Sequence, residues 1–269
     1  MRSLLASPLG FLIGVSLGAL GGGGSILAVP ALVYAAGQAP SKATTTSLVL
    51  VALSAAIGIV PHWRAQHVRF GAGAVFGVTG IGGSLLGSHW NEAADPDLLL
   101  LAFAAVMIVA AFAMWRRIDA EPRPAPRSVG AAAAPDSLHT RTPIDARTIA
   151  KVVVTGTVVG LLTGFFGVGG GFVIVPALVL ALDFEMPDAV GTSLLVIAIN
   201  SVVALSTRLG GDAIEWSTVA PFTVASLLGV VVGSRLASTR PPTSLQRGFV
   251  GLLVVVALYT GIRSGLALS

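Results

Sequence analysis

The sequence contains no cysteine and few charged residues. Of its 269 residues, 10% are Asp, Glu, Lys or Arg, whereas 54% are hydrophobic. The missing cysteines exclude disulfide bonds, thiolate metal sites and cysteine nucleophiles. An ordinary soluble domain carries about a quarter charged residues, so the scarcity of charge excludes that class and indicates an integral membrane protein.

Apolar runs recur along the chain and predict an all-α, polytopic transmembrane helical bundle. Each of two sets of four runs begins with a run that glycines interrupt. The runs fall at 3–37, 44–61, 70–89 and 98–115, and again at 151–182, 192–207, 217–234 and 248–265. The sequence therefore predicts a first transmembrane repeat (1–115) and a second one (151–269).

Between the two sets lies a segment rich in Pro, Ala and Arg, residues 116–150, which is interpreted as a linker. Basic segments beside spans mark the cytoplasmic side of a membrane protein. The net charge of +4 resides in such connecting segments, so the basic balance does not indicate nucleic acid as a partner. We expect residues 116–150 to be cytoplasmic.

The two sets are copies of one another. A shift of 146 positions aligns them without a gap, and glycines, prolines and hydroxyl residues coincide over some 80 residues. The matches include Gly10, Gly14 and Gly18 with Gly156, Gly160 and Gly164, Pro30–Val33 with Pro176–Val179, Thr46–Leu48 with Thr192–Leu194, and Gly83 and Gly87 with Gly229 and Gly233. Glycines spaced four apart predict close helix crossing.

The orientation of the second repeat depends on whether each interrupted segment crosses the membrane once or forms a hairpin. The first case gives parallel repeats and the second gives inverted ones. Counts of basic residues outside the linker do not decide between them. Acidic residues 90–97 correspond to 236–243, a stretch flanked by Arg235 and Arg247 and containing Arg240. This difference favours inverted repeats.

The glycine interruptions form a candidate substrate site. A glycine costs a helix interior about 1 kcal/mol relative to alanine, so each tract predicts a helix break. The following helix directs free N–H groups and about half a positive charge at the break, which suits an anion. Matched breaks are typical of midplane sites in secondary transporters; close helix packing is the alternative. The predicted binding residues are Gly21, Gly22, Gly23, Gly24, Ser25, Gly167, Gly169, Gly170 and Gly171.

Hydroxyl and amide side chains extend this candidate site. Residues seven apart lie on one face of a helix, because seven residues make about two turns. Such a face supplies donors to an oxyanion; hydrogen bonds within the residues' own helices are the alternative. The predicted substrate contacts are Thr46, Ser47, Thr192, Ser193 and Asn200.

Acidic residues are missing from the predicted spans, and the one histidine within them is His89 at a span end. Cation transporters and proton pumps keep a buried acid on their pathway, so this absence favours an anion. Arg208 and His62, near span ends, are predicted to attract or gate it. No H-x-x-x-H motif or paired-acid helix occurs, and we expect neither catalytic residues nor a metal or cofactor.

The paired motifs GALGGGGSILAVPAL with TTTSL and GFFGVGGGFVIVPAL with GTSLL resemble the TauE/SafE sulfite exporter family. The resemblance covers nearly the whole chain outside the linker. It implies a multi-pass transporter of the inner (plasma) membrane for small anions, namely sulfite, sulfonates or related organosulfur compounds. Alternating access between the repeats is the expected mechanism, and a homodimer is a further expectation. An anion channel and a non-transporting scaffold remain alternatives.

Overall fold

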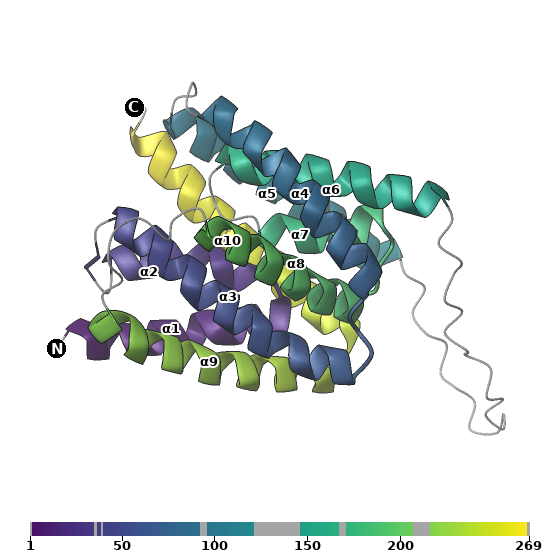
Figure 1. The fold of residues 1–269 in the computed structure, drawn as a ribbon. Coiled ribbons are helices and arrows are strands. Elements are labelled where there is room, and N and C mark those ends of the chain that lie inside the picture. The colour runs from purple at the N-terminus through teal and green to yellow at the C-terminus, as the bar shows by residue number, and fades with distance from the viewer. Residues whose placement is uncertain are drawn as a thin grey trace.

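The computed structural model describes residues 2–34, 37–38, 40–91, 96–120, 146–166, 171–206 and 216–267. These residues form helices and no strand (Figure 1). The helices are α1 (Arg2–Leu20), α2 (Gly23–Tyr34), α3 (Pro40–Arg64), α4 (Phe70–Asn91), α5 (Pro96–Ala120), α6 (Ala146–Phe166), α7 (Gly171–Ala181), α8 (Met186–Ser206), α9 (Trp216–Thr239) and α10 (Pro242–Ala267). The middle of the predicted linker, 121–145, lies outside the described residues.

Helices α3, α4, α5, α6, α8, α9 and α10 are long and apolar enough to cross a membrane. The apolar part of α1, together with α2 and α7, is shorter. Large apolar side chains on the long helices are exposed, among them Val78, Leu85, Val109 and Val255, as expected of surfaces that face lipid. The prediction of an all-α polytopic membrane bundle is confirmed.

Helix boundaries follow the 146-residue spacing seen in the sequence. Helices α3, α4 and α5 begin at residues 40, 70 and 96, and α8, α9 and α10 begin at 186, 216 and 242. The turns that precede α3 and α8 are also alike. The Gln38 N–H donates to the Leu32 carbonyl and the Phe184 N–H donates to the Leu178 carbonyl, each at 3.1 Å.

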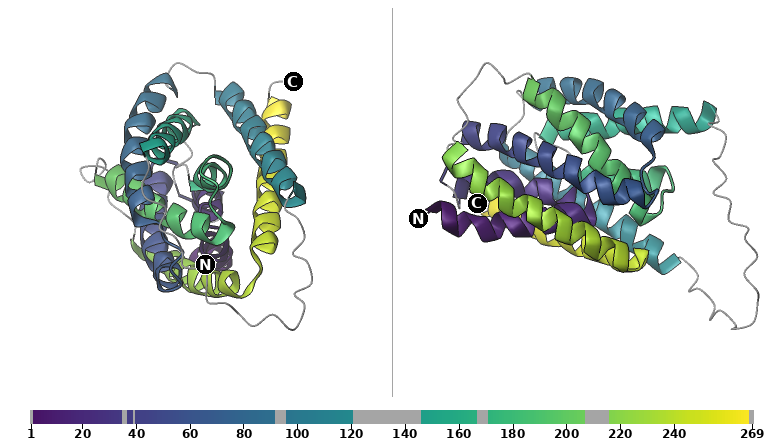
Figure 2. Two further views of the ribbon diagram at one scale, coloured as in Figure 1. Left: turned by 90° about the vertical axis from the view of Figure 1, so that its right-hand side faces the viewer. Right: turned by 60° about the horizontal axis from the view of Figure 1, so that its bottom comes forward.

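The first helix of each half packs against the fourth helix of the other half (Figures 1 and 2). Glycines permit this contact: a Cβ added to Gly14 would lie 2.0 Å from the Ser226 carbonyl oxygen, and one on Gly160 would lie 2.1 Å from that of Gly80. The predicted close crossing is confirmed. The contacts advance in the same direction along both helices of each pair, so α1 is parallel to α9 and α6 is parallel to α4. The contacts between α1 and α9 join Gly10 to Phe222, Gly14 to Ser226 and Gly18 to Val230. Those between α6 and α4 join Gly156 to Phe76, Gly160 to Gly80 and Gly164 to Ser84.

Helices that occupy the same place in the two halves run antiparallel where they meet. Along α3 and α8, Gly58 lies against Leu194 and His62 lies against Gly191. Helices α5 and α10 lie side by side at one edge of the bundle (Figure 2). There the Gln246 side chain donates to the Met114 carbonyl at 3.1 Å, and Gly261 lies near Ala104. The short helix α7 is buried over most of its length.

Candidate functional site

The first glycine tract reverses the chain inside the bundle. Helix α1 ends at Leu20 and α2 begins at Gly23, and between them Gly21 adopts φ +72°, a left-handed conformation that suits glycine. A Cβ on Gly24 would lie 2.4 Å from the Ile13 carbonyl oxygen, although a continuous helix would separate these residues by about 16 Å. Helix α2 therefore folds back on α1, and the predicted break is confirmed.

The N-termini of α2 and α7 meet at this break. A Cβ added to Gly22 would lie only 1.4 Å from the Gly171 carbonyl oxygen, and one on Gly171 would lie 2.4 Å from Ser25 Oγ. Ser25 is buried, and its hydroxyl donates to the Gly22 carbonyl at 2.7 Å. The structure thus brings two of the predicted half-helix ends together. Gly167, Gly169 and Gly170 lie outside the described residues.

Ser193 of α8 lies beside the reversed segment. A Cβ on Gly21 would meet Ser193 Oγ at 2.4 Å. The hydroxyl of Ser193 donates to the Val190 carbonyl at 2.8 Å, and its counterpart Ser47 donates to the Thr44 carbonyl at the same distance. Each hydroxyl hydrogen is thus bound within its own helix, which was the alternative prediction, while the oxygen of Ser193 still faces the break.

Thr192 faces a different part of the bundle from Ser193. Its Oγ1 accepts a hydrogen bond from the Arg69 backbone N–H at 3.1 Å, so its hydroxyl is directed at the α3–α4 connection and away from the glycines. Its counterpart Thr46 is buried in α3. Neighbouring residues on a helix point about 100° apart, and of these two only Ser193 lies against Gly21.

Asn200 is a point at which the halves differ. Its counterpart Ser54 lies 3.2 Å, oxygen to oxygen, from Ser226, and both serines are fully buried. The position of Ser226 is taken by Gly80 in the first half. Within the described residues, Asn200 Oδ1 is buried without a hydrogen-bond partner. An unsatisfied buried carbonyl is costly unless a ligand supplies a donor. The two halves therefore differ at this position: Ser54 is paired with Ser226, whereas the Asn200 carbonyl oxygen has no partner.

His62 is buried near the end of α1. Its Nε2 lies 3.4 Å from the Gly18 carbonyl oxygen, which has lost its helical partner because α1 ends at Leu20. The ring therefore lies beside the reversed chain, near the end of the bundle at which α3 finishes. Its counterpart Arg208 lies outside the described residues.

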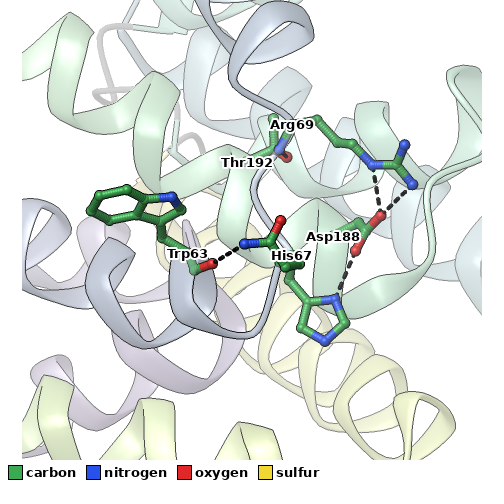
Figure 3. Close-up of polar contacts among 6 residues, drawn as sticks. Trp63, His67, Arg69, Asp188 and Thr192 are labelled. Carbon is green, nitrogen blue, oxygen red and sulfur yellow. Dashed lines mark hydrogen bonds and ion pairs between the residues drawn. The ribbon is translucent and has the colours of Figure 1, made fainter. Parts of the chain in front are cut away.

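An ion-pair cluster joins the α3–α4 connection to the first turn of α8 (Figure 3). Asp188 Oδ1 lies 2.8 Å from His67 Nδ1, and Asp188 Oδ2 accepts from Arg69 Nε and Nη2 at 2.9 and 2.8 Å. The Asp188 side chain is 13% exposed, whereas those of His67 and Arg69 are 40% and 50% exposed. The Arg69 guanidinium also lies over the Phe184 ring.

The end of α3 places His67 in this cluster. The His67 N–H donates to the His62 carbonyl at 2.8 Å and the Gln66 N–H donates to that of Trp63 at 2.9 Å. Gln66 has φ +62°, the left-handed conformation that glycine prefers at a helix C-terminus. The cap therefore fixes the direction in which the chain leaves the helix.

Gln66→Gly should stabilise the protein, because it relieves the cost of a side chain in the left-handed region. We expect a gain of about 0.5–1 kcal/mol, or about 1–4 °C in melting temperature in detergent. Gln66 also donates to the Trp63 carbonyl at 3.4 Å, a long exposed contact whose loss costs little. A lower melting temperature than that of the unsubstituted chain would contradict the assigned cap.

The sequence-based statement that the spans contain no acidic residue, and no histidine but His89, is wrong. Asp188 lies within the apolar helix Met186–Ser206, and His62 lies within Lys42–Arg64. The predicted apolar run begins at residue 192, whereas α8 begins six residues earlier. The sequence Met186-Pro187-Asp188 carried the signal, since proline and an acid are typical of a helix first turn. Asp188 is paired with the Arg69 guanidinium and the His67 ring, and it is not among the nearest contacts of the described glycines Gly21–Gly24.

Buried half-helices that meet inside a multi-span helical bundle are typical of membrane transport proteins. The chain belongs to the family described as "Sulfite exporter TauE/SafE", which matches residues 6–260. It is therefore a multi-pass membrane transporter and not an enzyme.

Proteins similar to the chain carry transporter names. A "Probable membrane transporter protein" of Xylella fastidiosa is 33% identical over 258 residues, covering 95% of this chain and 93% of that protein. The "Probable membrane transporter protein YunE" of Bacillus subtilis is 23% identical over 272 residues, covering 97% and 96%. No solved structure matches the chain.

Proposed function

We propose that the protein carries a small anion, namely sulfite, a short sulfonate or a related organosulfur compound, by alternating access at the junction of α2 and α7. The observation that carries this proposal is the approach of Gly22 to Gly171. Two helix N-termini, each with about half a positive charge, repel one another. An anion placed about 4 Å from both would gain about 2 kcal/mol from each at an effective dielectric constant of about 20.

The side chains around the junction support an anion rather than a cation. Those that contact Gly21, Gly22 and Gly23 are neutral: Ser193, Val175, Phe249, Leu252 and Leu20. Asn200 adds an amide on the face of α8 that carries Ser193, because the two are seven residues apart. Backbone N–H groups thus supply donors, and the Asn200 carbonyl can accept from an acidic O–H or an amine of the substrate. The family name supports the sulfur oxyanion class.

We further propose that the two halves are inverted repeats. Corresponding helices such as α3 and α8 run antiparallel where they meet. A rotation of 180° that exchanges two antiparallel helices has its axis perpendicular to both of them. Because spanning helices cross the membrane, such an axis lies in the membrane plane. Inverted repeats of this kind support alternating access, since each half can adopt the arrangement of the other.

The end of the bundle at which α3 and α5 finish is proposed to face the cytoplasm of the inner (plasma) membrane. Basic residues of the described helices and connections collect there, as cytoplasmic segments require. They are Arg64, Arg69, Arg116, Arg117, Arg147, Lys151, Arg235, Arg240 and Arg247. At the opposite end the described part of the chain carries Arg2, Lys42 and Arg263.

Uptake of radiolabelled sulfite into liposomes containing the purified full chain tests this function. We expect saturable uptake above that of empty liposomes, with inhibition by ethanesulfonate and none by the neutral dimethyl sulfone. Sulfite at about 100 times its dissociation constant should add about 2.7 kcal/mol to stability, or about 5–10 °C in melting temperature.

Two outcomes would contradict the carrier. Absence of both uptake and thermal stabilisation with sulfite and short sulfonates would favour a scaffold. Single-channel currents in planar bilayers would favour an open pore, because a carrier that rearranges on the microsecond to second timescale cannot pass comparable current.

A further inference from the structure

The Asp188 cluster connects the two halves of the chain at the end of the bundle where α3 and α5 finish. This end, at which basic residues collect, is called the basic end below. His67 and Arg69 belong to the first half, and Asp188 begins α8 of the second half. The Asp188 carboxylate is largely buried, whereas the Arg69 guanidinium and the His67 ring are partly exposed, so the cluster lies between the interior and the surface at this end. Removing one member of such a pair leaves a charge without compensation, which is strongly destabilising for the closed arrangement.

The α3–α4 connection also packs against the part of α8 that lies next to the proposed anion site. A Cβ on Gly191 would lie 2.4 Å from the His67 carbonyl oxygen, and Thr192 accepts the Arg69 N–H. The next residue, Ser193, lies against Gly21. Asp188 and Ser193 are five residues apart, about 7.5 Å along the helix. The α3–α4 connection therefore covers the turn of α8 between the ion pair and the glycine break.

We infer that His67, Arg69 and Asp188 form a gate at the basic end of the transporter. In the described arrangement the gate is closed, and it holds α8 against the α3–α4 connection so that water and substrate do not reach Ser193 from this side. Opening separates Asp188 from Arg69 and exposes the face of α8 that carries Ser193. The inference rests on the proposed transport function, but the gate can be measured without transport.

The internal repeat supports a role for this charge pair. The 146-residue shift places Lys42 on Asp188 and Glu215 on Arg69. Glu215 lies outside the described residues, so the correspondence is one of sequence. The first half carries a cation at both positions and the second half carries an acid at both, so the pair Arg69–Asp188 corresponds to Glu215 with Lys42, with the signs exchanged. Both combinations of a residue from one half with the corresponding residue from the other are thus complementary in charge.

These 269 residues contain no cysteine, which makes a direct test possible. Ser193→Cys is introduced into the full chain in membrane vesicles and labelled with a membrane-impermeant maleimide applied to the basic end. We expect Asp188→Asn, and separately Arg69→Ala, to raise the labelling rate about tenfold. Exchange of the pair, Asp188→Arg with Arg69→Asp, should restore slow labelling.

Ser238→Cys provides the matched control, because Ser238 is exposed in the last turn of α9, which lies at the basic end. It should label equally in every background and reports vesicle orientation. Labelling of Ser193→Cys that is unchanged in both single variants would overturn the gate, and so would an equal rise from both ends, which indicates a loosened fold. Faster labelling from the basic end alone, restored by charge exchange, supports the gate even if sulfite uptake fails, so the two proposals can fail separately.

Discussion

Gly22→Ala is expected to lower the initial rate of sulfite uptake by about 100-fold or more, the loss that a displacement of about 1 Å at a binding site can cause. The new Cβ would lie 1.4 Å from the Gly171 carbonyl oxygen and 1.9 Å from its carbon. Carbon and oxygen in contact need more than 3 Å, so the two half-helix ends must separate. Their N–H groups would then no longer lie together at the proposed anion site.

Gly82→Ala is the matched control, because it adds the same methyl group where no atom lies within 4 Å. It should transport at the rate of the unsubstituted chain. Melting in detergent separates loss of the site from loss of the fold, and the decisive measurement is made on Gly22→Ala protein that still melts cooperatively. Normal uptake by such protein would place the anion elsewhere than at the α2–α7 junction.

Ser193→Ala offers a milder change at the same place. It removes the hydroxyl that faces Gly21 and leaves the packing of α8 intact, since that hydroxyl donates only within its own helix. When substrate is bound, the Ser193 hydrogen must turn from the Val190 carbonyl to the anion, and the net gain of that exchange is about 1–1.5 kcal/mol. We therefore expect a smaller loss of uptake, about 5–10-fold. An unchanged rate together with unchanged sulfite affinity would remove Ser193 from the substrate contacts.

Much of this architecture could be predicted because it follows from local sequence. The duplication fixes equal helix boundaries, and α3 and α8 indeed begin 146 residues apart. The glycine break could be predicted because consecutive glycines destabilise any helix that contains them. The crossing glycines could be predicted because spacing by four places them on one helix face.

The helices that pack against these elements could not be predicted, because the residues on a helix face do not identify the helix that covers it. Glycines at Gly14 and Gly160 predict a close neighbour, but only the structure shows that each neighbour belongs to the other half. The Asp188 cluster was missed for the same reason. Arg69 and Asp188 are 119 residues apart, and no local pattern pairs them. Thr192 was expected with Ser193 beside the glycines, yet the Arg69 backbone binds it instead.

The first helix of each half packs against the fourth helix of the other half, and this arrangement has a large effect on stability. Gly14→Ala and Gly160→Ala should each lower the free energy of unfolding by about 3 kcal/mol, the upper range for overpacking a well-packed interface, and the melting temperature by about 6–12 °C. The added Cβ atoms would lie 2.0 and 2.1 Å from backbone carbonyl oxygens. Backbone cannot rotate away as a flexible side chain can, so the helix pairs must move apart.

Thermal unfolding of the purified chain in detergent measures both effects, with Gly251→Ala as the control because its Cβ would meet no atom within 4 Å. The α1–α9 and α4–α6 crossings occupy corresponding places in the two halves and share no residue, so the double variant should lose the sum of the single losses. A loss confined to Gly160→Ala would mean that α1 does not depend on α9. Equal losses would establish that each half of the transporter is held together by the first helix of the other.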